Sequence, residues 1–447
     1  MTFNSIFILT SSFDGEDETA ELSILVNGTS VTRMYDTETK SIRDWFRAPF
    51  LPLAFFLADN WWRLNFEPLP INRVPDSEWR LRHDLSSISA SIQPPLMIHG
   101  TGRRVVIEQA YGVPSLPAPS IYVASPTAEI DCSSFASGVD TFLHRASAES
   151  NRTGSSGLAT LLRDLQAERD DKEISSWRKL EAILGFDADR APDELIERLA
   201  SYEPRLGESV IDEVAAANPG SQAADILART FEAAGNGFDI DRKIARRLQS
   251  DADSELREQV WETAESAAAQ LRKEVGLKAG PVRSRAFGEI LGIKWESARQ
   301  AASASNAFPY AAVSCQNNKD RILFKSPPHA ASRRFEMARA LADAVWDQDS
   351  TFAPISRAKT ERQRFQRAFA QSFLCPFDDL REYLGPAVPG ETEIENAAVH
   401  FSVSEMMVRS LLVNKHILPA SRPSPSRDRH ARRLGPARCL PVEEQPQ

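Results

Sequence analysis

Arg339 and Asp343 are the residue pair whose types and spacing could do chemistry. They lie four positions apart in the segment 333–346, RRFEMARALADAVW, which predicts a helix. Side chains at i and i+4 leave a helix on the same face, so an arginine and an aspartate in these positions can form an ion pair. Two metal ligands at this spacing could bind one zinc ion, but arginine is not a ligand, and a zinc site takes at least three protein ligands. The spacing therefore predicts a charge pair.

The histidines and cysteines of the chain are scattered. Seven histidines are spread over 447 residues, and none lies within five positions of another, which is typical of surface or core histidines. The four cysteines, Cys132, Cys315, Cys375 and Cys439, show no CxxC spacing; this usage is typical of a reducing compartment. The sequence contains neither a glycine-rich phosphate-binding motif nor GxSxG. We therefore predict no metal ion and no cofactor.

Length and charge indicate the broad class of the protein. A chain of 447 residues is expected to form two or three domains. The formal net charge of -9 disfavours broad affinity for nucleic acids or anionic membranes. The N-terminus lacks the basic segment of a secretory signal. The longest apolar run, residues 50–58, is too short to cross a bilayer. We predict a cytoplasmic protein with no membrane partner.

The elements that would position Arg339 and Asp343 belong to a multi-domain α+β protein. Composition and hydrophobic periodicity divide the chain into an N-terminal α+β domain of small sheet and helices (1–132), a helical region (133–279), a C-terminal α+β domain (280–418) and a disordered tail rich in proline and arginine (419–447). Asn27-Gly28 predicts a type I′ hairpin turn. The aromatic-rich segment 41–66 is typical of the core of a small domain.

The immediate surroundings of the pair are a second small sheet and two helices. Residues 310–315 and 321–325 predict two strands joined by an Asn-rich turn. The helix 333–346 follows, and then a helix over 359–374 that ends at a Cys-Pro stop. A further helical stretch is predicted over 391–413.

The order of these C-terminal elements resembles the ImmA/IrrE metallopeptidase-like family. That order is a small sheet, a helix that begins with Arg-Arg-Phe, a second helix that ends in an FAxxFLxP-type motif, and a helix pair with the pattern A-x-x-F-x-V-S. The matching residues are Arg333, Arg334, Phe335, Ala338 and Leu341 on the first helix, Phe369, Ala370, Phe373, Leu374 and Pro376 on the second, and Ala398, Phe401, Val403, Ser404, Val408 and Leu411 on the pair. The resemblance covers about residues 280–418.

The resemblance implies a zincin-like domain over 280–418 in which the functional residues are replaced. The two zinc ligands of the family's His-Glu-x-x-His motif fall on Arg339 and Asp343, its catalytic glutamate falls on Ala340, and its third ligand falls on Phe365. Only Asp343 keeps a side chain that could touch a metal, so the fold is expected to be retained without the chemistry. The Arg339–Asp343 pair then either fills the vacated metal site or is a solvent-exposed pair of little energetic weight.

The known roles of the family suggest a regulatory function. Its members act on repressors or transcription regulators in stress responses, mobile elements and toxin–antitoxin systems. The resemblance therefore implies a non-catalytic regulatory protein that binds a repressor-like or antitoxin-like protein partner. Two alternatives stay open. One is an active zinc metallo-endopeptidase with displaced ligands. The other is a DNA-binding regulator that uses the helix pair 391–418, which resembles a helix-turn-helix with Ser404 as N-cap but offers only Arg409 and Lys415 as basic residues on its second helix.

Overall fold

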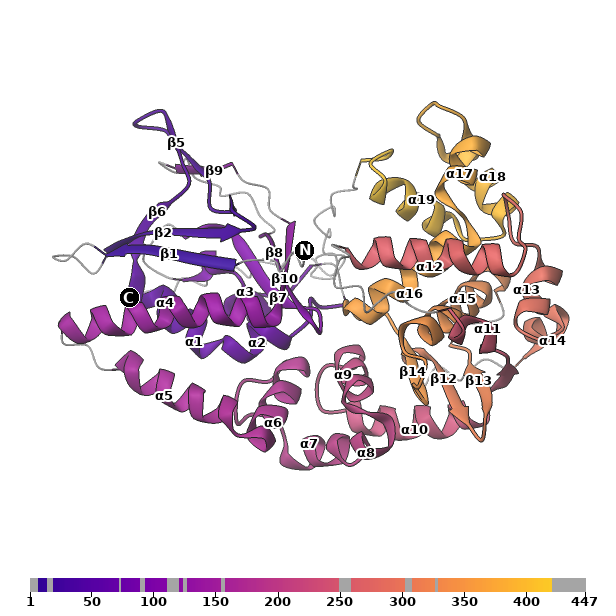
Figure 1. Cartoon of the computed structure of the whole chain (residues 1–447), viewed down its shortest axis with the longest axis horizontal. Helices are drawn as coiled ribbons and strands as arrows, with labels where there is room; N and C mark the ends of the chain where they lie inside the picture. Colours follow the sequence, from indigo (N-terminus) through magenta and orange to yellow (C-terminus); the bar gives the residue numbers. More distant parts are fainter. Residues whose placement is uncertain are drawn as a thin grey trace, which may run out of the picture.

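The computed structural model of the chain has a mixed α+β architecture (Figure 1). It describes residues 7–13, 19–71, 74–88, 93–110, 120–123, 127–153, 157–248, 259–301, 308–325 and 329–419. Many helices are combined with small antiparallel sheets, so the predicted α+β class is confirmed at this level. Large clusters of buried hydrophobic residues lie around the N-terminal sheets, among the middle helices and in the C-terminal part of the chain.

The N-terminal part combines small antiparallel sheets with helices packed against them. Its strands are β1 (Phe7–Phe13), β2 (Thr19–Val26), β3 (Thr29–Ser30), β4 (Met34–Asp36), β5 (Ser41–Arg43), β6 (Phe46–Pro49), β7 (Leu96–Gly100), β8 (Arg104–Gln109), β9 (Ser120–Tyr122) and β10 (Thr127–Asp131). Its helices are α1 (Phe50–Asp59), α2 (Trp61–Phe66), α3 (Ser77–His83), the 3-10 turn η1 (Leu85–Ser87) and α4 (Cys132–Thr153). Strand β2 pairs with β1, β3 and β6, strand β8 pairs with β7 and β10, and strand β4 pairs with β5 and β9. Helix α4 packs along β1 (Figure 1).

Two sequence signals explain local structure in this part. Asn27 and Gly28 both have positive φ angles, 51° and 77°, as a type I′ turn requires, and the predicted hairpin is confirmed by the pairing of β2 with β3. The aromatic segment contributes to the core, where Trp61 and Trp62 are buried. Pro52 lies in the first turn of α1, where its missing N–H removes no helical hydrogen bond.

The middle part is helical and also covers the C-terminal sheet. Its helices are α5 (Gly157–Asp170), α6 (Lys172–Ile183), α7 (Asp193–Ala200), α8 (Glu203–Leu206), α9 (Glu208–Ala217) and α10 (Ala223–Gly235). Helix α10 packs against β12 and β13, and α9 packs against β14, three strands of the C-terminal sheet. The middle core accordingly includes Ala312 and Phe352 from that sheet and Tyr310 just before it.

The C-terminal part contains one antiparallel sheet and the helices of the candidate site. Its elements are β11 (Phe238–Ile240), α11 (Lys243–Arg246), α12 (Val260–Glu274), α13 (Ser284–Ile290), α14 (Trp295–Gln300), β12 (Ala311–Gln316), β13 (Lys319–Leu323), α15 (Ala330–Trp346), β14 (Phe352–Ile355), α16 (Glu361–Leu374), α17 (Phe377–Leu384), α18 (Glu391–Phe401) and α19 (Glu405–Asn414). The sheet order is β11-β13-β12-β14. Asn317 and Asn318 form the turn between β12 and β13, both with positive φ angles.

The boundary predicted between residues 279 and 280 differs from the packing. Strand β11 pairs with β13, and α12 packs along α16, although both elements precede residue 280. The C-terminal core therefore includes residues from Ile240 onward. The prediction rested on a local change of pattern, and a local pattern does not contain the long-range pairing of a short strand.

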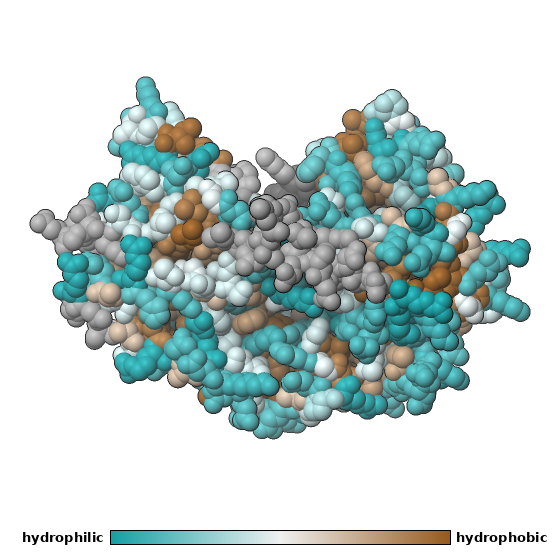
Figure 2. Space-filling model, viewed as in Figure 1, coloured by the Kyte–Doolittle hydropathy of each residue, from teal (hydrophilic) through white to brown (hydrophobic). Residues whose placement is uncertain are grey.

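Residues 420–447 of the predicted tail lie outside the residues that the structure describes. Within the described ranges, no helix combines the length and the apolar character needed to cross a membrane. The face shown in Figure 2 is largely hydrophilic, and its hydrophobic residues gather in small separate patches. One patch lies over β5 and β9, where Ile42, Ile121 and Val123 are exposed.

Candidate functional site

Helices α15 and α16 carry the candidate site, and both are held near their starts. Arg334 of α15 donates a hydrogen bond to the Val282 carbonyl (2.5 Å). Thr360 caps α16, where its Oγ1 accepts a hydrogen bond from the Gln363 N–H (3.3 Å). Helix α15 is buried around most of its circumference between the sheet, α11, α14 and α16. Arg339 is only 6% exposed and Asp343 is fully buried, so these two residues do not form a solvent-exposed charge pair.

The Arg339 guanidinium is bonded to oxygen atoms of neighbouring segments. Three oxygen atoms lie within hydrogen-bond distance of its Nη2 and share its two hydrogens: the Ser356 carbonyl (2.8 Å), Gln363 Oε1 (2.5 Å) and Gln366 Oε1 (3.0 Å). Burial, followed by the nearby Arg367 cation, lowers the pKa of Arg339 to about 9. The Arg339 cation is thus held by a carbonyl and two side-chain amides of α16 and the segment before it.

Asp343 pairs with arginines from other elements. Its Oδ1 accepts hydrogen bonds from Arg362 Nε (2.8 Å) and Gln366 Nε2 (2.9 Å), and its Oδ2 lies 3.6 Å from Arg242 Nη1. The predicted ion pair between Arg339 and Asp343 is therefore wrong. The Gln366 amide lies between the two side chains, accepting from Arg339 and donating to Asp343, because α16 packs directly on this face of α15.

Ala340 and Phe365 occupy different surroundings. Ala340 is fully buried, and its carbonyl accepts a hydrogen bond from Arg242 Nη1 (3.3 Å). The Phe365 ring lies against the rings of Trp346 and Phe369, with centroid distances of 5.2 Å and 6.2 Å. The Phe365 ring thus packs on the end of α15, in aromatic surroundings. Successive residues of a helix point about 100° apart, and Gln366, one position later, is the residue that reaches both Arg339 and Asp343.

Glu213 of α9 belongs to the same polar cluster, although it was not among the predicted site residues. Its Oε2 accepts hydrogen bonds from Thr360 Oγ1 (2.8 Å) and Gln363 Nε2 (3.1 Å). Burial raises the pKa of Glu213 to about 7. A signal was present in the sequence, because Glu213 lies in the apolar stripe of α9 next to Val210 and Val214. An acidic residue within such a stripe indicates a buried carboxyl group.

A second buried polar cluster, also missed, lies in the N-terminal part. His83 Nε2 is 2.8 Å from Glu67 Oε2, and His83 Nδ1 is 2.6 Å from the Ile98 carbonyl. Arg63 donates to the same carboxylate (2.5 Å), and the Trp79 ring stacks on His83 at 3.9 Å. His83 is fully buried, so this cluster joins α2, α3 and β7 and gives a substrate no access to the imidazole.

The helix pair α18–α19 forms as predicted, with Ser404 as the N-cap of α19. Its basic side chains have acidic partners. Arg409 pairs with Glu391, and Lys415 pairs with Glu265 of α12 (2.8 Å). These pairs reduce the positive charge that the second helix could offer to a phosphate backbone.

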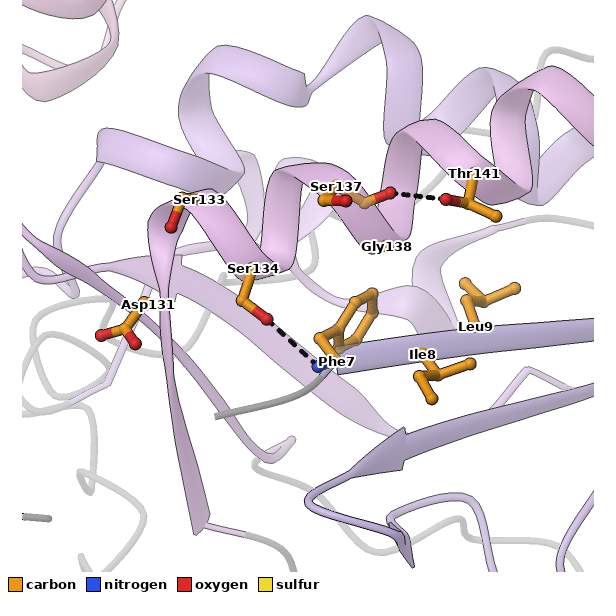
Figure 3. Close-up of a pocket in the computed structure, with 9 residues that line it drawn as sticks. All are labelled: Phe7, Ile8, Leu9, Asp131, Ser133, Ser134, Ser137, Gly138 and Thr141. Carbon is orange, nitrogen blue, oxygen red and sulfur yellow. Dashed lines mark hydrogen bonds between the residues drawn. The ribbon is translucent and has the colours of Figure 1, made fainter. Parts of the chain in front are cut away.

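A pocket of about 550 Å³ lies elsewhere, between the start of β1 and the first turns of α4 (Figure 3). It is lined by Phe7, Ile8, Leu9, Asp131, Ser133, Ser134, Ser137, Gly138 and Thr141. Part of its polar lining is used within the protein. Ser134 Oγ accepts a hydrogen bond from the Phe7 N–H (3.4 Å), and Thr141 donates to the Ser137 carbonyl (2.8 Å). The predicted site residues lie outside this lining.

Among the residues described by the structure, no three or more histidine, cysteine, aspartate or glutamate side chains are grouped so that they could hold a metal ion. Comparisons with known protein families, with curated proteins and with solved structures found no match. The contact between α15 and α16 is therefore the feature from which a function can be inferred.

Proposed function

We propose that the protein is a non-catalytic, ImmA/IrrE metallopeptidase-like regulator of the cytoplasm. Its C-terminal part would be a zincin-like domain that binds a repressor-like or antitoxin-like protein partner, in stress response or in the control of mobile elements. The order of elements supports this proposal. The hairpin of β12 and β13 precedes α15, which is followed by α16 and then by the pair α18–α19, as the resemblance implies.

The observation that carries the proposal is the position of Arg339. A guanidinium cation occupies the place that the resemblance assigns to a zinc ligand, and it is bound by three oxygen acceptors. Asp343, at the other ligand position, is neutralised by Arg362 and Arg242. A zinc ion placed here would meet positive charge and would have to displace these hydrogen bonds. A buried cation bound by oxygen acceptors is the opposite of an open metal site.

Purified protein is expected to contain well under one equivalent of zinc, and a chelator should leave its melting temperature unchanged. A structural zinc ion contributes folding free energy that chelation removes. Elemental analysis and thermal unfolding with and without chelator measure both quantities. Stoichiometric zinc, or a melting temperature that falls on chelation, would favour the active peptidase with displaced ligands.

The partner is tested by capture with the tagged full-length chain. A regulator that binds without catalysis should retain a repressor-like or antitoxin-like protein intact and in stoichiometric amount. Incubation with added zinc should leave the mass of that protein unchanged. Cleavage of the captured protein would contradict the proposal.

A salt titration of DNA binding tests the remaining alternative. If the α18–α19 pair does not read DNA, the full-length chain should bind duplex DNA weakly, and Arg409→Ala should not change that binding. Specific binding at physiological salt that is weakened by Arg409→Ala would instead favour a DNA-binding regulator.

A further inference from the structure

The first turn of α16 is a junction between the three parts of the protein. Thr360 and Gln363 face α9 of the middle part, where both bond to Glu213. Arg362 faces α15, where it pairs with Asp343. Glu361 and Arg364 of the same turn face the N-terminal part. Because consecutive residues of a helix point in different directions, one turn can contact three neighbours.

The contact with the N-terminal part involves the turn between β7 and β8. The Glu361 N–H, one of the donors left unpaired at a helix start, donates to the Thr101 carbonyl (2.7 Å). Arg104 Nε lies 3.5 Å from the Glu361 carboxylate, and Arg364 pairs with Glu129 of β10. Displacement of this turn of α16 would therefore change the contacts of the N-terminal part as well as those of α15.

Glu213 is the buried carboxyl group on the α9 side of this junction. Its carboxylate is 6% exposed, and its hydrogen bonds come from a hydroxyl and an amide, both uncharged. The amide belongs to Gln363, whose Oε1 accepts from Arg339. The Gln363 amide thus lies between Arg339 and Glu213, and Arg362, whose charge also acts on Glu213, forms its ion pair with Asp343.

Several other charged groups lie around the contact between Glu213 and α16. They are Asp212 on the same helix, Lys179 of α6, which pairs with Asp212 (2.6 Å), Glu203 of α8, and Arg362, Arg339 and Arg367 of α15 and α16. Strand β14 contains no charged residue, and the charged residues of α10 are exposed. Burial is the largest influence on Glu213 and favours its neutral form; the Arg362 cation favours ionisation, and the Asp212 carboxylate opposes it.

We propose that Glu213 is a proton-sensitive contact that holds the first turn of α16 against the middle part, and that loss of its proton loosens this contact. The buried carboxyl group is accommodated best when neutral, since ionisation places a charge where only neutral donors bind it. When the junction opens, Glu213 becomes hydrated and ionises at its ordinary pH. Proton release and opening are thereby linked, independently of whether the proposed partner-binding function holds.

The sign of the linkage follows from the direction of the shift. The pKa of Glu213 is raised from 4.5 to about 7 in the closed junction. The closed form therefore binds more protons between these values, and its stability falls as the pH rises from about 4.5 to about 7 and then levels off. Between pH 6 and pH 8 the closing equilibrium should weaken by roughly tenfold.

Hydrogen–deuterium exchange of the full-length protein tests this inference. Peptides that cover the first turn of α16 should lose protection by roughly tenfold between pH 6 and pH 8, after correction for the intrinsic exchange rates. Glu213→Gln, which is isosteric with the protonated acid, should remove this pH dependence. Glu208→Gln on the same helix, where the side chain is 58% exposed and pairs with Lys179, should retain it.

Three results would contradict the proposed role of Glu213. Unchanged protection of wild-type α16 across this pH range would overturn the inference without any variant. The inference is also overturned if Glu213→Gln keeps the wild-type pH dependence of protection, or if Glu208→Gln abolishes that dependence. Zinc content and partner capture are measured separately, so failure here leaves the proposed function untouched.

Discussion

Replacement of Asp343 by alanine is expected to lower the free energy of unfolding by about 3–5 kcal/mol, since removing one partner of a buried ion pair leaves an uncompensated charge. Asp343 is fully buried, accepts hydrogen bonds from Arg362 and Gln366, and lies 3.6 Å from Arg242. Without the carboxylate, Arg362 loses its buried anion and keeps only the partly exposed Asp347 at 3.7 Å, while Arg242 keeps its contact with Asp320 (3.0 Å). Denaturant unfolding of wild-type and variant proteins measures the difference.

Asp347 offers a matched control on the same helix end. It lies 3.7 Å from Arg362, but its side chain is 35% exposed. Asp347→Ala should therefore cost under about 1 kcal/mol, as is usual for partly solvated ion pairs. Equal losses for Asp343→Ala and Asp347→Ala, or a loss of less than about 1 kcal/mol for Asp343→Ala, would show that the buried network contributes little to stability.

Introduction of zinc ligands should succeed at position 366 and fail at position 365. The first variant combines Arg339→His, Asp343→His and Gln366→Glu; the second uses Phe365→Glu in place of Gln366→Glu. The Gln366 amide contacts both Arg339 and Asp343, so a carboxylate there can converge with two imidazoles. The first variant is expected to bind about one equivalent of zinc, since three protein ligands and a water complete a tetrahedral site.

The second variant is expected to bind no zinc and to lose stability by a few kcal/mol. Its new carboxylate would replace a ring that is 1% exposed and packs between Trp346 and Phe369, and burial of an unpaired charge is costly. Zinc titration and thermal unfolding of both variants give the comparison. Equal zinc binding by the two would mean that α16 does not present Gln366 to α15.

Much of the local structure could be predicted from the sequence because it depends on a few neighbouring residues. Asn27-Gly28 specifies a turn that needs two positive φ angles, and the observed angles are 51° and 77°. Ser404 was predicted as an N-cap from its position before an apolar run and is one in the structure. The spacing of Arg339 and Asp343 likewise placed both on one helix face.

The tertiary structure alone decided which side chains those faces meet. Arg339 and Asp343 bond to α16 rather than to each other, because the helix packed on that face presents Arg362 and two glutamines. Glu213 lies 147 residues before Thr360, its hydrogen-bond partner, and no local pattern contains that contact. The sequence by itself determined the α+β class, the Asn-Gly turn and the Ser404 cap. Tertiary packing determined the hydrogen-bond partners of the buried polar side chains, because such a group bonds to whatever donor or acceptor the fold places beside it.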